Sequence, residues 1–189
     1  VGDASWSTSA AFVDYDGDGE LHLFVPNYIR WTVPDERTCY TQPHPEDYCS
    51  PNSYSAPAPD TLYRNEGAGS FRDVSFEAGL RAVWGNGLGV VCTDFDGDGW
   101  TDLFVANDGM LNQLWKNRGD GTFADVAVAA GCAVDQDGRK KAGMGVHAAD
   151  VDFAGDEDLL VGNLSGATDS SSRHAGARYA AGTPLGGLA

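Results

Sequence analysis

The stretch Asp94-Phe-Asp-Gly-Asp-Gly-Trp-Thr-Asp-Leu-Phe-Val-Ala-Asn107 decides the fold of this 189-residue chain. Its first half is acidic and contains Gly99, a residue that permits a sharp turn, often at positive φ. Its second half contains the continuous apolar run Leu103-Phe-Val-Ala106, which is typical of a strand buried on both faces. The stretch therefore predicts an acidic hairpin loop that leads directly into a buried β-strand.

The same combination occurs twice more along the chain. Asp14-Tyr-Asp-Gly-Asp-Gly19 precedes Leu23-Phe-Val-Pro-Asn27, and Asp150-Val-Asp-Phe-Ala-Gly155 precedes Leu159-Leu-Val-Gly-Asn163. In all three copies the apolar strand ends in Asn. Such internal repetition is the signature of a repeat architecture.

A second repeated unit lies between the acidic hairpins. Leu62-Tyr-Arg-Asn-Glu-Gly-Ala-Gly-Ser-Phe-Arg-Asp-Val74 matches Leu114-Trp-Lys-Asn-Arg-Gly-Asp-Gly-Thr-Phe-Ala-Asp-Val126 at an offset of 52 residues. Each copy reads as strand, Gly-x-Gly turn and strand, which is a β-hairpin. Two hairpins make a four-stranded antiparallel sheet, and a repeat of this length is typical of a β-propeller blade. The five hairpins predict an all-β fold of about two and a half blades, part of a larger propeller.

Two segments depart from the repeat. Residues 28–59 form an insertion rich in proline and aromatic residues, and such long loops are often functional. Residues 164–189 are rich in Ser, Gly and Ala, and Ser170-Ser-Ser-Arg-His-Ala-Gly176 stands where another Leu-Tyr-Arg-Asn hairpin is expected. We therefore predict that the blades occupy residues 1–163 and that the tail forms no blade.

The acidic loops have the chemistry of calcium sites. Calcium takes six to eight oxygen ligands, and Asp at loop positions one, three and five directs three carboxylates inward. The carbonyl oxygen of position seven and a carboxylate at position nine complete the set. The loop at 94–102 has every element, whereas the other two depart from the pattern at His22 and Ala154. The predicted metal residues are Asp14, Asp16, Asp18, Glu20, His22, Asp94, Asp96, Asp98, Trp100, Asp102, Asp150, Asp152, Asp156 and Asp158.

An EF-hand begins with the same acidic spacing, but it needs Glu at position twelve on a helix. Position twelve is occupied by Val25, Val105 and Val161, each within a β-like run. The sequence thus excludes EF-hands. The recurrence of the loop at equivalent repeat positions favours metal binding, up to three Ca²⁺, over acidic turns without a metal.

The net charge and the positions of the cysteines limit the classes of binding partner and the compartment in which the protein is expected. The formal net charge of −16 argues against nucleic acid, and no apolar run is long enough to span a membrane. Cys39 and Cys49 lie in the insertion, where a disulfide would staple a poorly packed loop and would imply a secreted, extracellular or periplasmic location. Cys92 and Cys132 are interpreted as small buried thiols.

The block at 94–107, together with Gly-Asp-Gly-Thr-Phe-Ala-Asp-Val at 119–126, resembles FG-GAP/VCBS repeats, the calcium-binding blades of integrin α-subunit propellers and of many secreted bacterial proteins. The subgroup it is most similar to is the cartilage acidic protein (ASPIC/UnbV-like) family, because a Cys-containing insertion precedes an Asp-x-Leu-Tyr-Arg-Asn strand at 49–65. The resemblance covers about residues 6–163. It implies a seven-bladed propeller in full-length relatives, with calcium at the blade rim.

Three functional hypotheses follow. The leading one is a non-catalytic extracellular module in which calcium has a structural role and the propeller face or the insertion binds a protein or a glycan. The second is the propeller portion of a secreted polysaccharide-acting enzyme, although no Gly-x-Ser-x-Gly elbow, His-Glu-x-x-His motif or Walker loop is present. The third is a blade fragment that self-associates through open sheet edges.

Overall fold

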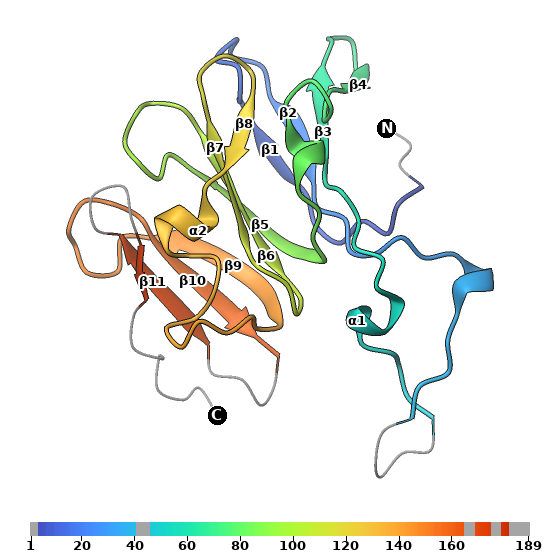
Figure 1. Cartoon of the computed structure of the whole chain (residues 1–189). Helices are drawn as coiled ribbons and strands as arrows, with labels where there is room; N and C mark the ends of the chain where they lie inside the picture. The colour runs from blue at the N-terminus through green and yellow to red at the C-terminus, as the bar shows by residue number, and fades with distance from the viewer. Residues whose placement is uncertain (1–3, 41–45, 165–168, 175–178, 182–189) are drawn as a thin grey trace.

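The computed structural model describes residues 4–40, 46–164, 169–174 and 179–181, and within them the chain forms three four-stranded antiparallel sheets placed side by side (Figure 1). In each sheet the strands neighbour one another in chain order. The first sheet contains β1 (Ala11–Val13), β2 (His22–Val25), β3 (Thr61–Asn65) and β4 (Phe71–Asp73). The second contains β5 (Gly87–Thr93), β6 (Asp102–Asn107), β7 (Gln113–Asn117) and β8 (Phe123–Asp125). The third contains β9 (Gly143–Ala149), β10 (Asp158–Asn163), β11 (Ser170–His174) and β12 (Tyr179–Ala181).

The prediction of an all-β fold built from four-stranded blades is confirmed. Apolar side chains fill the space between neighbouring sheets in two clusters. Between the first and second sheets, Phe24 and Leu62 pack in one cluster with Trp115. Between the second and third sheets, Phe104 packs with Leu159. Because successive residues of a strand point to opposite faces, the central sheet contributes to both clusters, which explains its continuous apolar sequence.

The third sheet corrects the prediction that residues 164–189 form no blade, for the described segments 169–174 and 179–181 of this tail; residues 165–168, 175–178 and 182–189 lie outside the described residues. Ser170–His174 is a strand that pairs with β10 in the register Leu159↔Ser172, which corresponds to Leu103↔Trp115 in the second sheet. β12 then pairs with β11 and completes the sheet. The described residues therefore form three blade-like sheets rather than two and a half, and these sheets form an arc rather than a closed ring.

The insertion at 28–59 connects β2 to β3, and its described parts project beyond the end of the first sheet that lies opposite the acidic loop (Figure 1). The predicted disulfide between Cys39 and Cys49 is present. The hydroxyl group of Tyr28 donates to Asp108 Oδ2 at 2.6 Å and ties the insertion to the second sheet. In the described segments four short helices lie outside the sheets: η1 (Val33–Asp35), α1 (Pro51–Tyr54), η2 (Leu80–Ala82) and α2 (Ala127–Ala130).

The outer face of the first sheet is partly apolar. Phe12 is 61% exposed and pairs across the strands with Leu23, on the face opposite the buried Phe24. The corresponding outer row of the third sheet contains His147 beside Leu160. No helix among the described residues is long and apolar enough to cross a membrane.

Candidate metal centres

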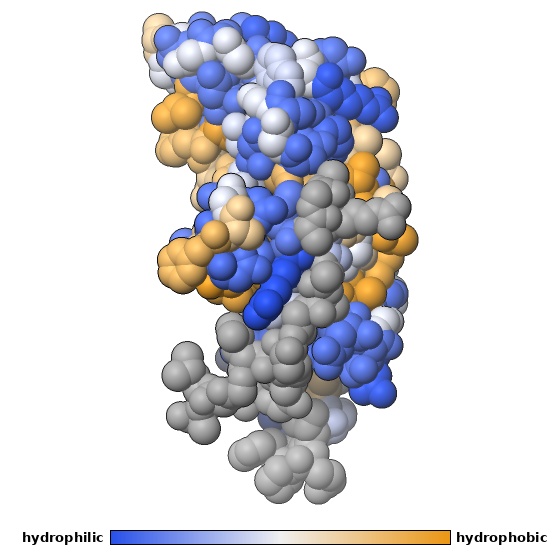
Figure 2. All heavy atoms as spheres, turned by 90° about the vertical axis from the view of Figure 1, so that its left-hand side faces the viewer, coloured by the Kyte–Doolittle hydropathy of each residue, from blue (hydrophilic) through white to orange (hydrophobic). Residues whose placement is uncertain are grey.

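The three acidic loops connect the first two strands of each sheet and lie along the same side of the molecule (Figure 1). Seen from that side, the upper part of the surface is largely hydrophilic, and apolar patches lie toward its margins (Figure 2). In each loop three or four ligating atoms lie within 4.8 Å of one another. The gathered groups are Asp14, Asp16, Asp18 and His22; Asp94, Asp96 and Asp102; and Asp150, Asp152 and Asp158.

The first Asp of each loop shapes the turn. Asp14 accepts hydrogen bonds from the N–H groups of Gly17, at 2.9 Å, and Gly19, at 3.1 Å. Asp94 and Asp150 accept from the equivalent part of their own loops. The turn requires positive φ at loop positions four and six. The angles are +73° at Gly17, +86° at Gly19, +71° at Gly97, +90° at Gly99, +61° at Phe153 and +92° at Gly155.

The residue at position nine joins the loop to the second hairpin of its sheet. In all three sheets this side chain is buried and accepts a hydrogen bond from the backbone N–H of the last residue of the third strand. The pairs are Asn65 N and His22 Nδ1 at 3.0 Å, Asn117 N and Asp102 Oδ1 at 2.7 Å, and His174 N and Asp158 Oδ1 at 2.8 Å.

The position-nine aspartates also reach back to the start of their own loops. Asp102 Oδ2 accepts from Phe95 N at 3.1 Å, and Asp158 Oδ2 accepts from Val151 N at 3.2 Å. Burial raises the pKa of Asp102 to about 7, although the two backbone donors act to lower it. A cation beside this carboxylate would favour its ionised form and lower that pKa.

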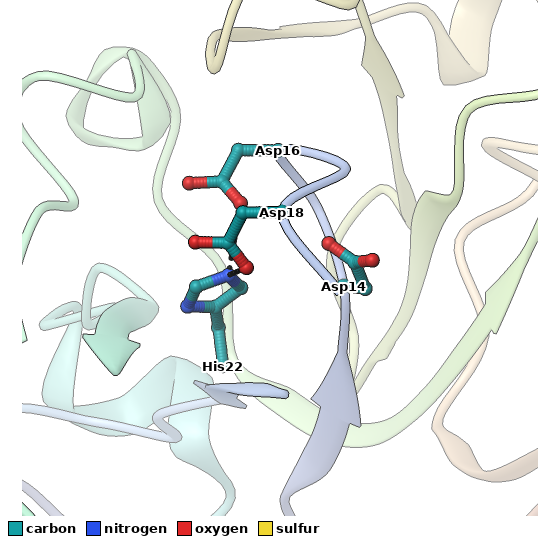
Figure 3. A group of neighbouring side chains, drawn as sticks. All are labelled: Asp14, Asp16, Asp18 and His22. Atoms are coloured by element: carbon teal, nitrogen blue, oxygen red, sulfur yellow. Dashed lines mark hydrogen bonds and ion pairs between the residues drawn. The ribbon is translucent and has the colours of Figure 1, made fainter. Parts of the chain in front are cut away.

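In the first loop, His22 takes the place of the position-nine aspartate. Figure 3 shows Asp16 and Asp18 on the same side of the loop, next to the His22 ring. Because Nδ1 accepts from a backbone N–H, the proton of the neutral ring is on Nε2, which then donates to Asp16 Oδ1 at 3.0 Å. In this tautomer neither ring nitrogen is free to bind a metal. His22 therefore orients Asp16, and the oxygen atoms of this loop that could hold a metal belong to the three aspartates.

The second loop differs from its predicted ligand set at Asp98. Its carboxylate accepts from Lys116 Nζ at 2.7 Å, and Lys116 also contacts Asp96. Burial lowers the pKa of Lys116, but the hydrogen bonds to both carboxylates outweigh it, so the net pKa is raised. The hydrogen bond from Lys116 lowers the pKa of Asp98. Lys116 thus partly neutralises this loop, and Arg64 stands at the equivalent repeat position, 3.4 Å from Asp16.

The third loop lacks the position-five carboxylate, because Ala154 stands there. Asp156 instead pairs with His174, with 2.6 Å between Oδ2 and Nδ1. Two carboxylate oxygens of these loops, Asp96 Oδ1 and Asp156 Oδ1, are buried and have no hydrogen-bond partner within the described parts of the chain. A buried carboxylate oxygen without a donor is costly, and a bound cation would satisfy it.

Trp100, at position seven of the second loop, contacts two other turns of the molecule with its ring. A Cβ atom at Gly17 of the first loop would lie 3.2 Å from the Trp100 ring, and one at Gly119 would lie 2.7 Å from its indole nitrogen. The ring therefore packs between the first acidic loop and the β7–β8 turn, where only glycine leaves room for it. Sequence reasoning assigned Trp100 only a carbonyl ligand and missed this contact.

The structure brings together ten of the predicted side chains and turns Asp98 away to Lys116. The carbonyl ligands predicted at Glu20, Trp100 and Asp156 stay predictions. Sequence reasoning also missed Lys116 and Arg64. Their signal was the Arg or Lys shared by Leu-Tyr-Arg-Asn and Leu-Trp-Lys-Asn, three residues after the polar residue that begins the strand.

Comparison with known proteins confirms the resemblance that the sequence indicates. Residues 94–161 match the FG-GAP-like repeat family. Over 158 residues, 84% of this chain and 21% of the relative, the chain is 31% identical to cartilage acidic protein 1 of Homo sapiens. The identity is 29% to the Mus musculus protein and 27% to the Xenopus tropicalis protein over the same shares. The chain thus spans about a fifth of the length of these relatives.

Proposed function

We propose that this chain, which carries an FG-GAP-like repeat and is similar to part of cartilage acidic protein 1, is a non-catalytic extracellular module whose three acidic loops bind Ca²⁺ in a structural role. The propeller face or the insertion would then bind a protein or a glycan. The observation that carries the calcium proposal is the convergence of carboxylates within 4.8 Å at the same position of three successive sheets.

Calcium would stabilise each sheet by relieving repulsion. The chain has a net charge of −16, and its carboxylates are crowded in these loops. Asp102 and Asp158 also hold the second hairpin of their sheets through a backbone N–H group. A cation that orders the loop therefore orders both hairpins, so metal binding and folding are linked.

Calorimetric titration with Ca²⁺, together with thermal unfolding in Ca²⁺ and in EGTA, tests the proposal. At a free Ca²⁺ concentration a hundredfold above Kd, one site adds about 2.7 kcal/mol to the free energy of unfolding. For a domain of this size that corresponds to a melting temperature roughly 5–10 °C higher. A melting curve that millimolar Ca²⁺ leaves unchanged would contradict the proposal.

Pairs of matched variants test which of the acidic loops bind Ca²⁺. Asp96→Asn removes a charge from the second loop and should remove one Ca²⁺ from the stoichiometry. Asp137→Asn is the control, because it changes the net charge equally at an exposed turn outside the three clusters. His22→Asp should increase the affinity of the first loop for Ca²⁺, since it introduces a carboxylate where the ring has no nitrogen free for a metal. Equal isotherms for Asp96→Asn and Asp137→Asn would refute the assignment of the second loop.

The disulfide between Cys39 and Cys49 supports an oxidising compartment, since disulfides persist there and are rare in the cytosol. The non-catalytic role is supported by how the conspicuous carboxylates are used. Asp14 shapes its turn, Asp102 holds the second hairpin and Asp98 pairs with Lys116. These interactions leave the acidic loops as structural elements rather than as a general acid and base.

Self-association through the outer face of the first sheet is a second candidate, favoured by the exposure of Phe12 beside Leu23. Sedimentation velocity tests it. Concentration-dependent dimers that Phe12→Ser abolishes would support this candidate, and a monomer across the micromolar range would contradict it.

A further inference from the structure

A hollow of about 290 Å³ lies at the end of the first sheet opposite its acidic loop. It is formed by the segment before β1 and the beginning of the insertion after β2. Its lining residues are Ala4, Ser5, Trp6, Ile29, Arg30, Trp31, Thr32 and Asp35. We propose that this hollow binds one ring of a neutral saccharide, which names the ligand class of the binding role proposed above and rests on it.

Two tryptophan rings give the hollow its shape. The ring centroids of Trp6 and Trp31 are 5.2 Å apart, and the rings are inclined to each other by 59°. Trp6 also meets Tyr28 edge to face at 5.9 Å, and it remains 45% exposed. At this separation the two indoles are in contact with each other, so a ligand ring enters beside them and meets a flat apolar indole face. The C–H face of a pyranose is such a partner, because it is apolar while the hydroxyl groups lie at the ring edge.

The backbone around the hollow is held in place before any ligand arrives. The carbonyl oxygen of Trp6 accepts from Tyr28 N at 2.9 Å, and Arg30 N donates to the carbonyl oxygen of Ala56 at 2.8 Å. Ile29 is buried between these contacts. A site fixed in this way loses little conformational entropy on binding.

Hydrogen-bond donors and acceptors are both present among the lining residues. Thr32 holds Asp35 Oδ2 through its hydroxyl group at 2.6 Å and its N–H at 3.1 Å, which fixes the orientation of the carboxylate. The guanidinium group of Arg30 lies 4.9 Å from the centre of the Trp84 ring and supplies donors. Sugar hydroxyl groups both donate and accept, so they match an acceptor and a donor at the same site. The buried indole N–H of Trp31 has no partner within the described residues, and a hydroxyl oxygen could accept from it.

The charges select among ligand classes. An aromatic hollow with a carboxylate also suits a quaternary ammonium group, but Arg30 places a like charge among its lining residues. A sulfated or uronic glycan is disfavoured by the net charge of −16 on the chain. A wholly apolar ligand would strip water from Arg30 and Asp35 without replacing it. A neutral saccharide meets none of these penalties.

The test uses the whole chain in millimolar Ca²⁺. Neutral oligosaccharides of glucose, mannose and N-acetylglucosamine are titrated while tryptophan fluorescence and saturation-transfer NMR are recorded, with choline and heparin as comparison ligands. We expect saturable binding of at least one neutral oligosaccharide. Trp6→Ala should weaken it about tenfold, which corresponds to ~1.4 kcal/mol of lost aromatic contact. Tyr48→Ala, an exposed aromatic residue of the same insertion, is the control and should bind as the parent does.

Asp35→Asn is the second variant, because it keeps an oxygen for Thr32 and alters only the charge at an exposed position. It should weaken binding severalfold even if Trp6→Ala does not fold. The proposal is overturned if no neutral oligosaccharide binds, if choline or heparin binds in its place, or if Trp6→Ala and Asp35→Asn both bind as the parent does. The Ca²⁺-induced rise in melting temperature is recorded in parallel, so a failure of saccharide binding is distinguished from a failure of calcium binding.

Discussion

Phe153 stands at a loop position where the other two acidic loops have glycine. Its φ is +61°, against +73° at Gly17 and +71° at Gly97. A non-glycine residue in this region costs roughly 1–2 kcal/mol because Cβ crowds the following carbonyl oxygen. The side chain is 92% exposed, so its removal sacrifices little burial.

Phe153→Gly should therefore stabilise the chain. Relief of the backbone strain contributes roughly 1–2 kcal/mol, and the greater freedom of glycine in the unfolded chain subtracts about 0.4–1 kcal/mol. The expected net gain is about 0.5–1 kcal/mol, or roughly 1–4 °C in melting temperature for a domain of this size. Urea unfolding in EGTA measures it without a contribution from bound metal.

Two variants serve as controls. Phe153→Ala removes the ring but keeps Cβ at the same φ, so its stability should stay close to that of the parent. Gly97→Ala introduces the strain at the equivalent position of the second loop, where a Cβ atom would meet nothing within 4 Å. It should destabilise the chain. If Phe153→Gly proves no more stable than Phe153→Ala, the strain at this position is not a determinant of stability.

Three further predictions concern other parts of the chain. Burial raises the pKa of Asp60 from 3.8 to about 7, so the folded state holds this proton more tightly and the free energy of unfolding falls as pH rises from about 4 to about 7. Asp60→Asn should match the parent near pH 4 and exceed it by a few kcal/mol above pH 7 in urea unfolding; a pH-independent difference would contradict this. Replacing both Cys39 and Cys49 by Ala removes about 3 kcal/mol of loop-closure restraint and should expose residues 28–59 to limited proteolysis, while cleavage within the sheets would contradict a local effect. Trp100→Ala removes the ring that packs on the first acidic loop and should lower the Ca²⁺ affinity of that loop severalfold by calorimetry, whereas an unchanged isotherm would show that the loop holds its shape alone.

The acidic loops and the first two sheets are predictable from sequence because their determinants are local. The turn glycines, the alternate aspartates and the apolar run of β6 specify loop and strand within fourteen residues. The orientation of Asp98 is not predictable in this way, because it depends on Lys116 from another hairpin of the sheet. The tautomer of His22 likewise depends on a backbone donor in β3.

The second hairpin of the third sheet, β11 and β12, escaped prediction for a different reason. β11 reads Ser-Ser-Ser-Arg-His where the other sheets have Leu-Tyr-Arg-Asn or Leu-Trp-Lys-Asn, so the apolar signal is absent. The preserved signal is sparser. Asp169 and Arg173 keep the spacing of Asp60 and Arg64. Asp169 accepts from the backbone N–H of the last residue of β10, as Asp60 accepts from that of Asn27, two residues after β2.

The hydrogen bond from the end of the third strand to position nine has a consequence for how such repeats diverge. Its donor is a backbone N–H, which every residue except proline supplies. Mutations can therefore change Asn to His at this point, as between positions 117 and 174, without loss of the bond. Only the acceptor side chain is constrained by this bond, so a repeat can lose the recognisable sequence of its second hairpin while its acidic loop keeps its pattern. Searches for degenerate copies of the repeat should therefore start at the acidic loop. The sequence after the loop then needs only a residue other than proline at the end of the third strand, where the backbone N–H donates to position nine.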